Sequence, residues 1–140
     1  MPIPQVKFRE VVLQALYATS LGNMEREALT ELMGEELAMT KSTVRQAFER
    51  VDAIYGHLEE IDPIIEATSS EYAHERMHTV ELAILRLAVF ELSFDKNVPP
   101  KVAIAEAIRL ARKFSTPESA SFINAIVDAI YRARTEEPAP

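Results

Sequence analysis

Apolar residues recur along most of the chain every three or four positions, the spacing that places them on one side of an α-helix. Between residues 79 and 131, three such segments follow one another with short joints marked by proline. The first, residues 79–94, is apolar on nearly every side, which is typical of a helix buried in the middle of a small protein. The next two, about 100–114 and 117–134, are amphipathic. This pattern predicts the core of an all-α domain.

The first half of the chain shows the same periodicity, with more breaks. Two helices are predicted over about residues 4–20 and 24–39. A long third helix follows a cap at Ser42 or Thr43 and carries apolar residues to Ile61. Asp62-Pro63 then indicates the start of a short helix. The pattern leaves open whether helix resumes near residue 71 or at residue 79. We therefore expect one compact bundle of six or seven helices.

Length and composition indicate one soluble globular domain. The chain has 140 residues, of which 48% are apolar and 26% charged, and that length suits a single core. We expect the domain to cover residues 1–134 and residues 135–140 to form a flexible acidic tail. No apolar run reaches the length of a membrane span, no secretory leader is visible, and the absence of cysteine suits a reducing compartment. A cytoplasmic protein without a membrane association is expected.

The net charge restricts the class of partner. It is −7 at pH 7, whereas a protein that binds nucleic acid by itself usually carries a basic excess. An acidic body instead favours a basic protein partner through complementary charge. RNA binding would then depend on a local basic patch or on the partner.

One motif has a catalytic precedent. His74-Glu75-Arg76-Met77-His78 reads H-E-x-x-H, which on a zinc-protease helix brings two imidazoles to one metal ion and supplies a glutamate base. The neighbouring residues are charged or carry hydroxyl groups, as at a solvated helix start. Surface histidines are therefore the preferred interpretation, and a zinc metalloprotease is a remote alternative.

Other residues give no support for catalysis. Adjacent carboxylates such as Glu35-Glu36 and Glu59-Glu60 point about 100° apart on a helix, so such a pair does not share a proton-transfer site. No phosphate-binding glycine loop or nucleophile motif occurs in the sequence. We expect no enzymatic activity, no catalytic residue, no metal and no cofactor.

Four runs of sequence resemble a known family. LRLAVFEL, VPPKVAIAEAIRLARKF and S-x-x-FINAIVD in the second half, with FREVVLQALY near the start, resemble the NusB family of bacterial transcription antitermination factors. The resemblance implies an all-α fold of two helical sub-bundles packed together, without catalytic activity. It also implies pairing with NusE, a small-subunit ribosomal protein. That pair would bind the boxA element of nascent RNA in the elongation complex during rRNA transcription.

The resemblance also implies site residues. The residues matched to the family's RNA surface are Lys7, Arg9, Tyr17, Glu118, Ser121 and Phe122. Those matched to its partner surface are Glu81, expected to supply an ion pair, and Arg86. From the residues alone, Tyr17 and Phe122 are interpreted equally well as core or as stacking surfaces. Phe122 lies near the start of a helix, where backbone N–H groups can hold a phosphate.

Fewer basic residues are present than in the family. Where the family commonly has a run of arginines, this chain reads PQVKFR, and Ser121 replaces a family lysine. The loss of about three cations removes about three units of counterion release from RNA binding. We therefore expect boxA-like RNA to bind only with the partner present. One alternative is a self-associating helical protein whose homodimer masks the RNA site. Another is an RNA-binding module like the one that precedes rRNA cytosine methyltransferases.

Overall fold

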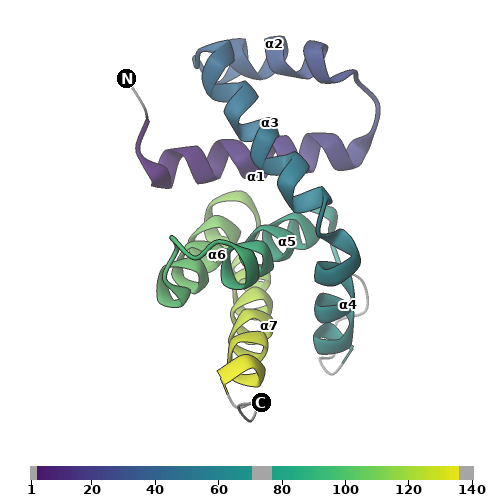
Figure 1. The fold of residues 1–140 in the computed structure, drawn as a ribbon, viewed down its shortest axis with the longest axis vertical. Helices are drawn as coiled ribbons and strands as arrows, with labels where there is room; N and C mark the ends of the chain where they lie inside the picture. Colours follow the sequence, from purple (N-terminus) through teal and green to yellow (C-terminus); the bar gives the residue numbers. More distant parts are fainter. Residues whose placement is uncertain (1–2, 71–76, 136–140) are drawn as a thin grey trace. The chain divides into compact units, whose positions relative to one another are not determined.

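The structure, a computed structural model, describes residues 3–70 and 77–135 and has seven helices in those ranges (Figure 1). The all-α prediction is confirmed. The helices are α1 Gln5–Leu21, α2 Arg26–Glu36, α3 Lys41–Tyr55, α4 Leu58–Ser69, α5 Thr79–Phe94, α6 Pro100–Phe114 and α7 Pro117–Thr135. None of these helices is both long enough and apolar enough to cross a lipid bilayer.

The chain divides into two compact units, with the division between Gly56 and His57. The N-terminal unit holds α1, α2 and α3, and the C-terminal unit holds α4 to α7. These units correspond to the two helical sub-bundles that the resemblance implies. The expected domain limit at residue 134 and the flexibility of the tail stay predictions, because residues 136–140 lie outside the described part of the chain.

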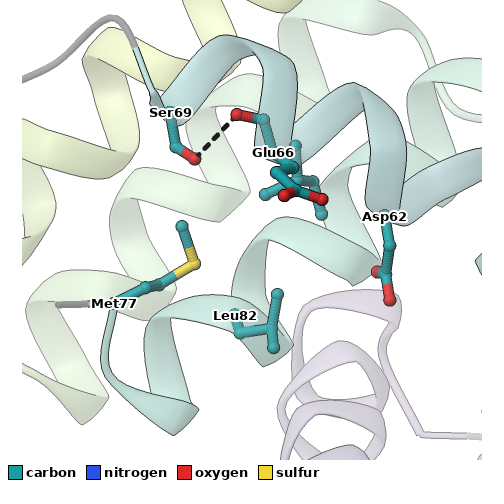
Figure 2. Close-up of a pocket in the computed structure, with 6 residues that line it drawn as sticks. Asp62, Glu66, Ser69, Met77 and Leu82 are labelled. Atoms are coloured by element: carbon teal, nitrogen blue, oxygen red, sulfur yellow. Dashed lines mark hydrogen bonds between the residues drawn. The ribbon is translucent and has the colours of Figure 1, made fainter.

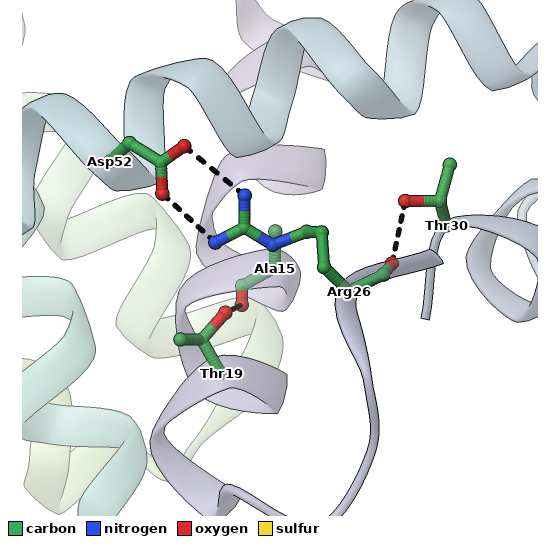
Figure 3. Close-up of polar contacts among 5 residues, drawn as sticks. All are labelled: Ala15, Thr19, Arg26, Thr30 and Asp52. Atoms are coloured by element: carbon green, nitrogen blue, oxygen red, sulfur yellow. Dashed lines mark hydrogen bonds and ion pairs between the residues drawn. The ribbon is translucent and has the colours of Figure 1, made fainter. Parts of the chain in front are cut away.

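In the N-terminal unit, α3 contacts both α1 and α2. Its apolar residues Val44, Phe48 and Val51 are buried, as the spacing predicts. Arg26 at the start of α2 donates to both carboxylate oxygens of Asp52 on α3, at 2.9 and 3.1 Å (Figure 3). Its guanidinium also lies 4.4 Å from the centre of the Phe48 ring. These contacts hold α2 to α3 above the buried residues.

The predicted ends of α2 are wrong by a few residues, and its C-terminal turn explains why. The backbone N–H of Met39 donates to the carbonyl of Gly34, and that of Ala38 donates to Glu35. This is the Schellman arrangement, which ends a helix through one residue of left-handed conformation. Ala38 takes that role with φ of 53°. Glycine is the usual residue at this position, so the end of the helix could not be predicted from an alanine.

The boundary predicted between the third and fourth helices is also wrong. α3 is capped by Thr40, whose hydroxyl oxygen accepts from the backbone N–H of Thr43, and it ends at Tyr55. α4 then begins at Leu58, and Pro63 lies inside it. Apolar residues continue through the break at the helical spacing, as Ile54, Leu58, Ile61 and Ile65. Periodicity alone therefore could not reveal the break.

In the C-terminal unit, α5 contacts α4, α6 and α7. Its residues Ile84, Leu85 and Val89 are fully buried, so the prediction of a central apolar helix is confirmed. The predicted spans of α6 and α7 match the observed helices closely. Proline marks the first turn of both, where its missing N–H costs no hydrogen bond.

Candidate RNA and partner surfaces

Three candidate RNA-binding residues, Lys7, Arg9 and Tyr17, lie on α1, and they differ in their exposure to solvent. Tyr17 is 39% exposed, so its ring is accessible for stacking. Lys7 is exposed, and its ammonium lies 3.8 Å from the Glu10 carboxylate. Arg9 is only 8% exposed. In this conformation Lys7, and not Arg9, presents positive charge to the solvent.

The other three candidates lie in the first two turns of α7. The Thr116 hydroxyl accepts from the backbone N–H of Ser119 at 3.0 Å and so caps the start of α7. Glu118 and Ser121 are exposed, and Phe122 is half-buried. The cap and the first intrahelical hydrogen bonds fix this turn, and its outer side carries Glu118 and Ser121.

Glu81 lies inside the C-terminal unit, with a side chain that is 0% exposed. One carboxylate oxygen accepts from the backbone N–H of His78 at 2.8 Å, as in a capping box at the start of α5. The other accepts from the Ser119 hydroxyl of α7 at 2.6 Å. Ser119 in turn accepts from the Ser115 hydroxyl at 2.8 Å. Glu81 therefore joins the starts of two helices, and its carboxylate is not on the surface.

Arg86 is paired within the same unit. Its guanidinium donates to both carboxylate oxygens of Asp62 on α4, at 2.8 and 3.0 Å. A two-point pair of this kind fixes the geometry of both groups. Arg86 thus joins α5 to α4, and Asp62 brings this ion pair to the rim of a pocket.

That pocket has a volume of about 260 Å³ (Figure 2). Asp62, Glu66 and Ser69 of α4 give it polar groups, whereas Ile65 of α4, with Met77 and Leu82, gives it an apolar part. Its lining residues are Asp62, Ile65, Glu66, Ser69, Met77 and Leu82. An apolar hollow with carboxylates at its edge suits a side chain that has an aliphatic stem and a cationic end.

The H-E-x-x-H motif is only partly visible. His74 and Glu75 lie outside the described residues. His78 caps α5, and its imidazole Nδ1 lies 3.3 Å from the Glu81 carboxylate. His78, the histidine of the motif that the structure describes, therefore serves as the N-terminal cap of a helix.

The structure brings Glu118, Ser121 and Phe122 together in the first two turns of α7, and it pairs Arg86 with Asp62, which lines a pocket. Sequence reasoning missed the part played by Ser119. Its partner Glu81 lies 38 residues away in the chain, and no local pattern joins two such distant positions. The pairing of Arg86 with Asp62 and the pocket were not visible in the sequence either.

Two helical units, an exposed tyrosine on α1 and a pocket with carboxylates at its edge make this an all-α protein whose surface groups suit the binding of a partner. The sequence model of the NusB family matches residues 6–132. The transcription antitermination protein NusB of Geobacter sp. (strain M21) is 39% identical over 137 residues, covering 92% of this chain and 94% of its own. That of Agathobacter rectalis is 37% identical over 123 residues, covering 86% and 94%. The chain belongs to the NusB family.

Solved structures agree with this assignment. A crystal structure of the antitermination factors NusB and NusE in complex with double-stranded RNA matches with a TM-score of 0.74 and 30% identity, covering 92% of this chain and 96% of that one. NusB of T. maritima matches with a TM-score of 0.72 and 31% identity, covering 100% and 96%.

Proposed function

We propose that this chain is a transcription antitermination factor that pairs with a NusE-type ribosomal protein. The pair binds boxA-type RNA in the elongation complex during rRNA transcription. The family match over residues 6–132 carries the proposal. The likeness to NusB bound to NusE and double-stranded RNA supports both kinds of partner. We further propose a cytoplasmic location and no enzymatic activity.

Each of the two units carries some of the proposed RNA-binding residues. Tyr17 offers a ring for base stacking, and Lys7 offers a cation. At the start of α7, Phe122 supplies a second ring beside the polar groups of Glu118 and Ser121. Arg9 belongs to the proposed set only if its side chain leaves its buried position. With a net charge of −7, the chain depends on a basic partner for much of its attraction to phosphate.

The proposed partner surface is the pocket of α4 and α5 with its acidic edge. Asp62 and Glu66 favour a basic side chain of the ribosomal protein, while Met77 and Leu82 contact its aliphatic stem. Arg86 holds Asp62 in place. Glu81 is fully buried, so we propose that it does not form the ion pair with the partner itself.

Titration calorimetry and gel retardation test the proposal. The chain is mixed with purified NusE-type protein, and boxA RNA is titrated with the chain alone and with the pair, at two salt concentrations. A scrambled RNA of equal length is the control. We expect heat on mixing, a ternary band only for boxA RNA, and a steeper dependence on salt for the pair. The proposal is wrong if neither the heat nor the band appears.

The same samples decide between this function and self-association. Light scattering should give a monomer mass, or a dimer that the partner dissociates. A dimer that persists with the partner present and excludes RNA would favour the self-associating protein. Zinc found bound to the purified chain by elemental analysis would instead support the metalloprotease alternative.

A further inference from the structure

The starts of α5 and α7 are joined by a chain of buried hydrogen bonds. Glu81 and Ser119 are 0% and 3% exposed. The carboxylate of Glu81 accepts from the backbone of His78 and from the Ser119 hydroxyl, and Ser119 accepts from Ser115. Thr116 accepts from the Ser119 backbone N–H. Ser119 is therefore held through both its side chain and its backbone.

A buried carboxylate at this place needs an explanation, because removing a charge from water is unfavourable unless hydrogen bonds replace the water. Capping the start of α5 would require only a carboxylate at the solvent-exposed side of the helix. The bond from Ser119 to Glu81, at 2.6 Å, instead spans two helices. Hydrogen bonds to charged acceptors are short and strong. This one fixes the position of the first turn of α7 relative to α5.

We propose that Glu81 and Ser119 are positioning residues for RNA binding. Through their hydrogen bond they set where the first turns of α7 present Glu118, Ser121 and Phe122. The inference rests on the proposed function, because it assigns these residues to the same RNA surface. It adds that Glu81 acts through Ser119, within the protein.

The geometry explains why a small displacement would matter. Ser119 lies next to Glu118 in the chain and three residues before Phe122, so it shares a helical turn with both. Loss of the anchor frees this turn to move against α5. Preorganised surfaces bind better because less ordering is needed on binding. Ser119→Ala should therefore weaken RNA binding by the NusE-bound pair by about tenfold, on the scale of one hydrogen bond to a charged group.

The test compares Ser119→Ala, Glu81→Gln and the double variant with a matched control. The control is Arg134→Gln. Arg134 also joins α7 to α5, at the far end of the helices, by donating to the Leu92 carbonyl and the Ser93 hydroxyl. RNA affinity is measured with NusE-type protein at saturation, well below each variant's melting temperature. We expect both single variants to lose affinity, the double variant to lose no more than the worse single one, and the control to match wild type.

Hydrogen exchange in the free chain gives a second result that does not involve RNA. Ser119→Ala should speed exchange of the amides of residues 119–122, and Arg134→Gln should not. Unchanged exchange there, additive losses in the double variant, or an equal loss in the control would each overturn the inference. If wild type binds no boxA RNA with its partner, the proposed function fails, whereas the exchange result still decides whether Glu81 and Ser119 position this turn.

Discussion

Replacing Tyr17 with alanine removes the exposed ring that we assign to base stacking. Stacking of one base on an aromatic side chain contributes about 1–3 kcal/mol. Since about 1.4 kcal/mol corresponds to a tenfold change in Kd, the NusE-bound pair should bind boxA RNA about 5- to 140-fold more weakly. Fluorescence anisotropy with labelled RNA, at fixed salt and saturating partner, measures the change.

Tyr55 provides the matched control. It lies on α3 of the same unit and is 36% exposed, against 39% for Tyr17. Truncating either ring should therefore cost a similar, small amount of stability. Tyr55→Ala should leave RNA affinity within about twofold of wild type, since no RNA role is assigned to it. Equal affinities for the two variants, whether both weakened or both unchanged, would refute the assignment of Tyr17 to the RNA surface.

Three further predictions concern stability. Ala38→Gly should stabilise the chain in urea unfolding, because Ala38 has a φ of 53°. Relief of about 1–2 kcal/mol of left-handed strain, less about 0.5–1 kcal/mol for the greater chain entropy of glycine, leaves a gain of about 0.5–1 kcal/mol; a loss of stability would contradict the Schellman turn. Leu85→Ala should cost about 2–5 kcal/mol, since Leu85 is fully buried in α5; a cost below about 1 kcal/mol would contradict the central position of that helix. The hydrogen bond from Arg26 lowers the pKa of Asp52. This pair therefore stabilises the fold above the ordinary carboxyl pKa and less as the pH falls. Asp52→Asn should cost up to about 1 kcal/mol at neutral pH, and the cost should shrink below about pH 4; a cost independent of pH would contradict the ion pair.

Much of the fold could be predicted because local rules set it. The apolar run around Leu85 indicates a buried helix, and the prolines at the joints, Pro100 and Pro117, mark helix starts. The same rules failed at Gly56, where apolar spacing continues across the break, and at Ala38, where an uncommon residue ends the helix. Helix identity follows from side-chain periodicity, whereas a stop depends on one residue's backbone conformation.

The candidate site residues also divide into features that the sequence could predict and features that it could not. The aromatic and basic candidates could be named from their motifs, and Tyr17 is accessible as that interpretation requires. The motifs do not show whether a side chain is buried. Glu81 and Arg9 were therefore expected on the surface, whereas the structure buries both side chains. Whether a charged side chain faces solvent depends on which helices cover it.

The sequence by itself determined the helical class, the central apolar helix and the family, because each depends on residue types at fixed spacing. Only the tertiary structure decided that Glu81 meets Ser119, that Arg86 meets Asp62, and that residues of α4 and α5 line a pocket with Met77. These contacts join residues that are 24 and 38 positions apart. Such pairs form only when packing of the apolar faces brings separate helices together.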